Sequence, residues 1–180
     1  MSMDGFVAGP NGEHDWIVMD PAFDFEGYMK EFDTILMGRR TFEIAGKGGG
    51  GAMPGVRTIV CSRTLRPADH PKTTIVDDAV DMVRTLKREE GKDIWLFGGG
   101  SLFRSLLDAK LVDTIEVAVV PIALSKGIPL LPAGERSPQL RLLTSKILPS
   151  GVVTLNYSIL YGGAAAKPKK SRKPDKSGKR

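Results

Sequence analysis

The sequence predicts an α/β fold whose sheet is parallel for most of its width and antiparallel at one edge. Short β-rich apolar segments alternate with amphipathic segments of helical period through the first two thirds of the chain. The pattern then changes to an alternating run at 113–121 and two long β-rich segments, 139–148 and 152–161, joined by Pro149-Ser150-Gly151. Alternating β and α segments are typical of parallel sheets, and the terminal hairpin adds antiparallel strands.

Each element can be placed along the chain. A brief strand-like piece lies within 1–9, and a short helix around 23–31 offers Phe23, Tyr28 and Phe32 as candidate core residues. Further strands are expected at 33–38, 56–62, 72–76 and 93–97, and further helices at 39–46, 77–91 and 101–111. The clearest helix is 77–91, where Val80, Val83 and Leu86 share one face. Asp77 or Asp78 can cap its start, and Gly91 can end it.

Length and composition indicate one globular domain, expected at 1–163, followed by a tail at 164–180. A chain of 180 residues with 41% hydrophobic and 26% charged residues is ordinary for a globular protein. No stretch reaches the roughly 20 apolar residues that span a bilayer, and the start lacks a secretion signal. We therefore expect no membrane association and a cytoplasmic location. The single cysteine, Cys61, excludes an internal disulfide and is expected to be a buried strand residue.

The tail holds the excess positive charge. The whole chain has a formal net charge of +5, but residues 1–163 contain 18 basic and 20 acidic residues and are therefore mildly acidic. The tail contains no aliphatic residue larger than alanine, so we expect it to be disordered and solvated. Its only expected contact with nucleic acid is weak and non-specific.

Three predicted strand ends carry residues suited to phosphate binding. "FGGGSLF" (97–103) runs from a strand through three glycines into a helix, "MGRRTFE" (37–43) repeats that order with arginines, and "CSRTL" (61–65) follows a third strand. Glycines let the backbone approach an anion, and free N–H groups at a helix start attract it. Together the three ends favour a dinucleotide along the carboxyl edge of the sheet, and the Ser-Arg-Thr cluster favours NADP over NAD.

The ordered segments resemble a known superfamily. "SMDGFVAGPNGEHDW" (2–16), "ILMGRRTFE" (35–43), "VCSRTL" (60–65), "IWLFGGGSLFRSLLDAKLVDTIEV" (94–117) and "IPLLP" (128–132) are together similar to the dihydrofolate reductase-like superfamily. The nearest branch is the C-terminal reductase domain of the riboflavin-biosynthesis deaminase/reductase. The resemblance implies a three-layer αβα sandwich, NADPH as hydride donor, a small-molecule substrate and a homodimer. It implies an activity like that of 5-amino-6-(5-phosphoribosylamino)uracil reductase.

The resemblance also implies roles for individual residues. The pyrophosphate and its ribose would lie at Gly38, Arg39 and Thr41, and the adenosine 2′-phosphate at Ser62, Arg63 and Thr64. The glycine bed against the pyrophosphate and nicotinamide would be formed by Gly98, Gly99, Gly100, Ser101 and Leu102. The segment "AGPNGEHDW" would be a mobile loop over the nicotinamide, with Trp16 closing the substrate pocket and Asp4 near its mouth.

The chain also departs from that family. The family's first strand extends upstream of the "S-x-D-G" motif, whereas only Met1 precedes Ser2 here; either this strand is brief, or the sequence starts inside a longer natural strand. The turn before "IPLLP" is "LSKG" (124–127), which carries over no ligand contact. The zinc deaminase half has no counterpart, because the chain has two histidines, one cysteine and no P-C-x-x-C motif. We therefore expect no metal site.

The expected reaction is hydride transfer from NADPH to a C=N or C=O carbon of a small heterocyclic or ribose-linked substrate. Asp4 is the candidate proton donor, with Asp20, Asp24 or an ordered water as alternatives. Dihydrofolate or pterin reduction remains an alternative activity. A non-catalytic NADPH-binding module, or a carrier for a nucleic-acid-binding tail, are alternatives of a different class.

Overall fold

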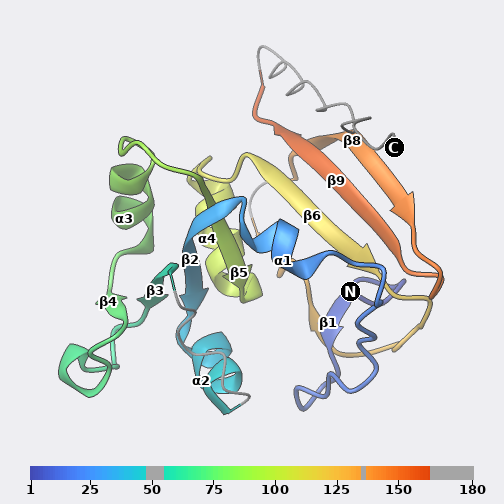
Figure 1. The fold of residues 1–180 in the computed structure, drawn as a ribbon, viewed down its shortest axis with the longest axis horizontal. Helices are drawn as coiled ribbons and strands as arrows, with labels where there is room; N and C mark the ends of the chain where they lie inside the picture. The colour runs from blue at the N-terminus through green and yellow to red at the C-terminus, as the bar shows by residue number, and fades with distance from the viewer. Residues whose placement is uncertain (48–54, 135–136, 163–180) are drawn as a thin grey trace, which may run out of the picture.

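The fold is built on a parallel four-stranded sheet of order β4-β3-β2-β5, as the sequence predicts (Figure 1). Its strands are β2 (Phe32–Gly38), β3 (Arg57–Cys61), β4 (Thr74–Val76) and β5 (Asp93–Gly98). The computed structural model describes residues 1–47, 55–134 and 137–162. The expected tail at 164–180 lies outside these residues. β2 lies inside the sheet and is buried on both faces over residues 34–37, which explains its three consecutive apolar residues Ile35, Leu36 and Met37.

Helices cover both faces of this sheet and give three layers. On one face α3 (Ala79–Leu86) and α4 (Gly100–Asp108) pack Val83, Leu86 and Leu106 against Leu36 and Ile59. On the other face α1 (Phe25–Met29) and α2 (Arg39–Lys47) place Met29 and Phe42 against Ile35, Met37 and Val60. None of the helices in the described part of the chain is long and apolar enough to cross a membrane.

The last third of the chain forms an antiparallel sheet of order β6-β9-β8, with strands β6 (Thr114–Val119), β8 (Gln139–Ile147) and β9 (Val153–Leu160). The predicted hairpin is confirmed: β8 and β9 are joined through Pro149-Ser150-Gly151, and Gly151 has a φ of +83°. One face of the sheet packs Ile159 and Ile115 against Phe103 and Leu107 of α4.

The single mixed sheet expected from the sequence is divided. Among the described residues no strand pairing joins β5 to β6, and β1 (Phe6–Ala8) instead pairs antiparallel with β7 (Ile128–Pro129). The chain start lies along β6, where Ser2 forms a parallel bridge with Val120 and the Val120 N–H donates to the Met1 carbonyl at 2.8 Å. The described residues therefore form a four-stranded parallel sheet, a three-stranded antiparallel sheet and the β1–β7 pair, and the two larger sheets contact each other through side chains.

The cap predicted at the start of α3 is present, but α2 and α3 end at other residues than predicted. Asp78 rather than Asp77 caps α3, accepting the Asp81 N–H at 2.9 Å. The helix then ends at Leu86, five residues before Gly91, and a short turn follows. At the other side of the sheet, α2 continues through Gly46 to Lys47. A short 3₁₀ helix, η1 (Pro67–Asp69), lies between β3 and β4.

Candidate functional site at the carboxyl edge of the parallel sheet

The three predicted phosphate-binding segments meet at one edge of the molecule. Because β2, β3 and β5 are parallel neighbours, their carboxyl ends lie side by side: Gly38 is opposite Cys61, and Met37 is opposite Gly98. A Cβ atom built on Gly38 would lie 3.8 Å from the Gly99 nitrogen. Segments 60 residues apart in sequence thus share one short stretch of sheet edge.

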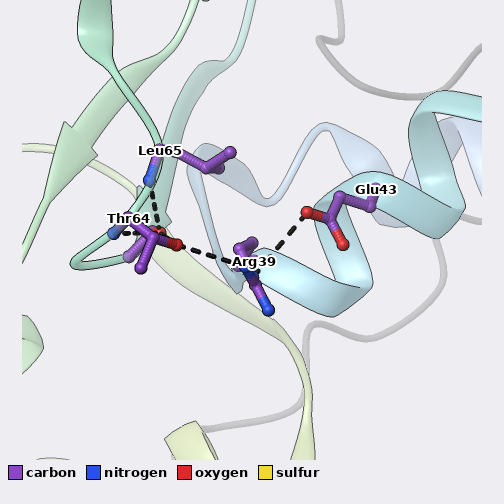
Figure 2. Close-up of polar contacts among 5 residues, drawn as sticks. Arg39, Glu43, Thr64 and Leu65 are labelled. Carbon is purple, nitrogen blue, oxygen red and sulfur yellow. Dashed lines mark hydrogen bonds and ion pairs between the residues drawn. The ribbon is translucent and has the colours of Figure 1, made fainter.

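Arg39 links two of these segments (Figure 2). Its Nη1 donates to the Thr64 hydroxyl at 3.2 Å, and its Nε lies 3.7 Å from the Glu43 carboxylate one helical turn along α2. The Ser62 hydroxyl accepts the backbone N–H groups of Thr64 (3.2 Å) and Leu65 (3.0 Å), so it holds the turn after β3. Arg39 and Thr64 are therefore in contact, as a shared ligand would require, while Ser62 mainly shapes the loop.

Arg63 points its charge to solvent at the same edge. It is exposed, and no partner for its guanidinium is found among residues 1–47, 55–134 and 137–162. Arg40, at the start of α2, is also exposed. Two exposed cations beside the turn after β3, where Arg39 also reaches the Thr64 hydroxyl, form a surface that suits a phosphate group.

The structure requires glycine at two of the three consecutive positions 98–100, for different reasons. Gly98 has a φ of +127°, a conformation that side-chain-bearing residues rarely adopt, and the Gly98–Gly99 peptide bond is cis. A Cβ on Gly100 would lie 2.8 Å from Pro132 Cδ and 3.0 Å from the Leu130 carbonyl oxygen, so this glycine is required by packing. Gly99 has an ordinary extended backbone, and a Cβ there would meet only the Thr41 hydroxyl, at 3.4 Å.

Gly38 and Gly99 therefore form an open face of backbone at the strand ends. Neither residue has a positive φ, and neither would clash with the protein if it carried a methyl group. The N–H groups at the start of α4 lie beside them, and Gly99 provides no side-chain cap. Uncovered backbone N–H groups at a helix start fit a pyrophosphate group, so the residues present are compatible with a dinucleotide.

The other residues of this predicted set lie around that face. Ser101 is exposed on the first turn of α4, and its carbonyl accepts the Ser105 hydroxyl at 3.0 Å. The Thr41 hydroxyl is adjacent to Gly98 and Gly99. The partly buried Leu102 side chain packs against the core cluster that contains Val83 and Leu86 of α3, and not on the open backbone of Gly38 and Gly99.

Comparison with known proteins places the chain in a family. The profile of the RibD C-terminal domain family matches residues 1–154. The chain is 33% identical over 169 residues to the uncharacterized protein YyaP of Bacillus subtilis (strain 168), covering 87% of this chain and 90% of that protein. It is 29% identical over 155 residues to the uncharacterized protein YwjB of the same organism, covering 81% and 87%. The chain belongs to the RibD C-terminal domain family.

Solved structures show the same fold. A protein from Shewanella sp. PV-4 assigned to riboflavin biosynthesis superposes with a TM-score of 0.76 at 23% identity, over 89% of this chain and 95% of that one. A diaminohydroxyphosphoribosylaminopyrimidine deaminase/5-amino-6-(5-phosphoribosylamino)uracil reductase from Thermotoga maritima superposes with a TM-score of 0.64 at 16% identity. The second match covers 88% of this chain but only 54% of the Thermotoga chain. These structures confirm the predicted fold class, and the predicted family is confirmed by the match to the RibD C-terminal domain.

In this family member Asp4 anchors a loop. Its carboxylate accepts the backbone N–H groups of Leu124 (3.1 Å) and Ser125 (2.7 Å). A hydrogen bond from Ser2 and those two N–H groups hold the pKa of Asp4 below its usual range. Asp4 is thus ionised at neutral pH, which suits a group that positions the 121–126 segment better than one that donates a proton.

Trp16 and the alternative acids also have structural contacts. Trp16 packs on the cluster of Val120, Leu148 and Val152, and the described contacts do not bring it to the glycines. Asp20 is buried and accepts the backbone N–H groups of Ala22 and Ser150, at 2.8 and 2.9 Å. Asp24 caps α1 by accepting the Gly27 N–H at 2.8 Å. Asp20 thus ties its loop to the β8–β9 turn, and Asp24 holds the start of α1.

Sequence reasoning missed an aromatic row between α1 and β5. Ring centroids lie 5.5 Å apart for Tyr28 and Trp95, 5.6 Å for Phe32 and Trp95, and 4.8 Å for Trp95 and Phe97. Phe97 directly precedes the glycines and is 41% exposed. The alternation of "IWLF", which puts Trp95 and Phe97 on one face of a strand, was the available signal. The row continues the edge toward the antiparallel sheet.

The described residues offer no metal site and no reactive thiol. Within the described residues no group of three or more His, Cys, Asp or Glu side chains could hold a metal ion. Cys61 is half-buried at the end of β3, and burial together with the nearby Asp78 carboxylate raises the pKa of its thiol to about 11. A thiol with so high a pKa is a poor nucleophile near neutral pH.

Proposed function

We propose that this chain is an NADPH-dependent reductase that transfers hydride to a small planar heterocycle of the ribosylamino-pyrimidine type. The observation that carries the proposal is the open backbone face of Gly38 and Gly99, flanked by Arg39, Thr64 and Arg63. Membership in the RibD C-terminal domain family supports a reductase-like function. The reductase activity in the name of the Thermotoga protein supports the choice of substrate class.

Each part of the cofactor is assigned to the residues nearest to it in the proposed binding mode. Gly38, Gly99 and the first N–H groups of α4 would bind the pyrophosphate, and Arg39 and Thr41 would bind the adjacent ribose. When bound, NADPH supplies the hydride. The chain would bind and orient the cofactor. It would hold the cofactor against the carboxyl edge of the parallel sheet and leave the face of β5 free for the acceptor.

Arg63 would select the cofactor. An exposed arginine in the turn after β3, beside the Thr64 hydroxyl, is placed to bind a phosphate on the adenosine ribose. The test is to titrate the protein with NADPH and with NADH, comparing Arg63→Ala with the control Arg66→Ala, an exposed arginine of the same loop. We expect Arg63→Ala to weaken NADPH binding at least about tenfold, which is 1.4 kcal/mol, and to leave NADH binding unchanged. Equal losses for both cofactors, or for both variants, would contradict this role.

Turnover needs a separate assay. Candidate pyrimidine and pterin acceptors are added under NADPH, and the loss of nicotinamide absorbance is followed. Oxidation with a ribosylamino-pyrimidine supports the proposal, oxidation only with a pterin supports the alternative activity, and binding without any oxidation indicates a non-catalytic module. The expected homodimer stays a prediction, which sedimentation of the purified protein tests.

A further inference from the structure

A cavity lies at the end of α4 that is remote from the glycines. Its volume is about 260 Å³, and it is lined by Leu107, Lys110, Ser137, Pro138, Leu160 and Tyr161. α4 begins at Gly100 beside the candidate functional site and ends at Asp108, and nine residues of helix span roughly 13 Å. None of the residues assigned to the cofactor lines this cavity, so it is a separate feature of the molecule.

Most of the cavity wall is apolar and firmly held. Leu107 is 1% exposed and belongs to a core cluster against which Tyr161 packs. The Tyr161 hydroxyl donates to the Val112 carbonyl at 2.7 Å, which fixes the ring. Burial raises the pKa of Tyr161, so the hydroxyl stays protonated and keeps this bond at neutral pH. Because an apolar cavity of about 150 Å³ can hold a benzene ring, this cavity has room for one aromatic ring with a substituent.

Lys110, at the mouth of the cavity, has a left-handed backbone. Its φ is +59°, its N–H donates to the Leu107 carbonyl at 3.0 Å, and the Leu111 N–H donates to the Leu106 carbonyl at 2.9 Å. In helix ends with these two bonds the left-handed residue is usually glycine, because a Cβ atom is unfavourable in that conformation. The chain therefore has a lysine at a position where glycine would give the more stable helix end.

The lysine side chain has no contact within the described chain that offsets this cost. Among the described residues the one other non-glycine residue with a positive φ is Ser125, and its N–H donates to the Asp4 carboxylate at 2.7 Å. Lys110 is exposed, and its ammonium forms no hydrogen bond or ion pair within residues 1–47, 55–134 and 137–162. Unfavourable backbone conformations are often kept for function, and a ligand in the adjoining cavity would account for this one.

The charges around the cavity favour an anion. The two carboxylates that flank the end of α4 are already paired, Asp108 with Arg104 at 2.7 Å and Asp113 with Lys87. The Ser137 hydroxyl is exposed and has no partner in the described part of the chain. The polar groups of the lining are thus one unpaired ammonium and one free hydroxyl, and both can donate to a carboxylate.

We propose that this cavity binds a small aromatic monocarboxylate. The ring would lie against the apolar side chains of Leu107, Leu160 and Tyr161, and the carboxylate would accept hydrogen bonds from the Lys110 ammonium and the Ser137 hydroxyl. The cavity shares no residue with the candidate functional site, so this site does not depend on the proposed reductase function.

The test uses 4-fluorobenzoate as the probe and follows its fluorine NMR signal during titration with the full chain. The matched comparison is 4-fluorobenzamide, which has the same ring without the charge. We expect saturable broadening of the benzoate signal, and binding of the amide at least about tenfold weaker, because its hydrogen bonds are not charge-assisted. Equal affinity for the two probes, or no saturable effect of the benzoate, overturns the proposal.

Lys110→Gly gives two opposite expected changes. It should weaken benzoate binding at least about tenfold, and it should raise Tm by about 2–4 °C, because glycine has no Cβ in the left-handed conformation. A loss of binding in a variant that is more stable than wild type does not come from misfolding. If Lys110→Gly binds benzoate as tightly as wild type, the proposal is wrong.

Three further variants serve as controls. Ser125→Gly removes the other positive-φ side chain at a place outside the cavity, and it should change benzoate affinity less than about twofold. Lys110→Asn keeps a residue that tolerates the left-handed conformation but lacks the charge, so it should lose binding as Lys110→Gly does. Lys110→Arg keeps the charge and should bind within about threefold of wild type. Equal affinities of Lys110→Asn and Lys110→Arg would overturn the role of the ammonium.

Discussion

The glycines at 98–100 allow folding and cofactor binding to be separated residue by residue. In Gly100→Ala the new methyl group meets Pro132 Cδ at 2.8 Å and the Leu130 carbonyl oxygen at 3.0 Å. In Gly98→Ala the backbone must keep a φ of +127° with a side chain present. In Gly99→Ala the backbone is ordinary and the nearest atom is the Thr41 hydroxyl at 3.4 Å. The first two changes should therefore destabilise the protein, and the third should not.

The magnitudes follow from these contacts. Overpacking at Gly100 should cost about 1–3 kcal/mol of unfolding free energy, and strain at Gly98 a similar amount. For a domain of this length each kcal/mol lowers Tm by about 2–4 °C. Gly99→Ala and Gly38→Ala should change the unfolding free energy by less than about 0.5 kcal/mol. Each should weaken NADPH binding at least about tenfold, because a methyl group occupies the space where a phosphate oxygen meets the backbone N–H.

The assay combines thermal unfolding with NADPH titration of the same preparations. Gly46→Ala is the control, because this exposed glycine in α2 has no atom within 4 Å of its Cβ position and alanine favours the helix. It should leave NADPH affinity unchanged and stabilise the protein slightly. If Gly38→Ala and Gly99→Ala bind NADPH as tightly as wild type, the open backbone face does not bind the pyrophosphate and the reasoning is refuted.

Three further predictions concern single side chains. Asp4→Asn should lower turnover, because it loosens the 121–126 segment. The pH profile of turnover should keep its shape, because Asp4 is already ionised at neutral pH. If the variant instead loses the fall in rate at high pH, Asp4 is the proton donor. Asp20 has a lowered pKa, so its stabilisation is present above about pH 4 and is lost as pH falls through the folded pKa. The Tm of Asp20→Asn should therefore lie below that of wild type at pH 7 and approach it near pH 3, and a constant difference would contradict this. Cys61 should react with a thiol reagent at pH 8 at least about a hundredfold more slowly than free cysteine, since its pKa is about 11. As the control, the unfolded protein should be labelled at the rate of free cysteine. If the folded protein is labelled at that same rate, the thiol is not buried as described.

The meeting of the three glycine- and arginine-bearing segments at one sheet edge could be predicted from sequence because it depends on local signals. The apolar residues Ile35, Leu36 and Met37 of β2 are followed directly by Gly38, and parallel strands necessarily bring their carboxyl ends together. The Asp78 cap is likewise local, since the carboxylate bonds to an N–H three residues on. The end of α3 could not be predicted, because residues 87–90 are good helix formers. There the Asp33 carboxylate accepts the Lys92 N–H at 2.6 Å and directs the chain into β5.

The contacts between α1, β6 and the chain start could not be predicted because they are long-range. Tyr28 and Glu116 carry no joint pattern in sequence, and only the placement of α1 over the two sheets brings them together. The pairing of β1 with β7 joins two- and three-residue strands about 120 residues apart, too short to show a period. Asp4 could be recognised as important from its motif, but its two partners at 124 and 125 are fixed by tertiary structure.

The division between the two sheets has a consequence for how specificity can evolve. The predicted cofactor contacts all come from the parallel sheet and its helices, whereas β6, β8 and β9 belong to the antiparallel sheet. Since no strand pairing joins β5 to β6 in the described chain, substitutions on β6 and β9 need not disturb the strand ends that carry the glycines. Under the proposed function, substitutions in the antiparallel sheet could therefore change the acceptor while the residues proposed to bind the nucleotide stay the same.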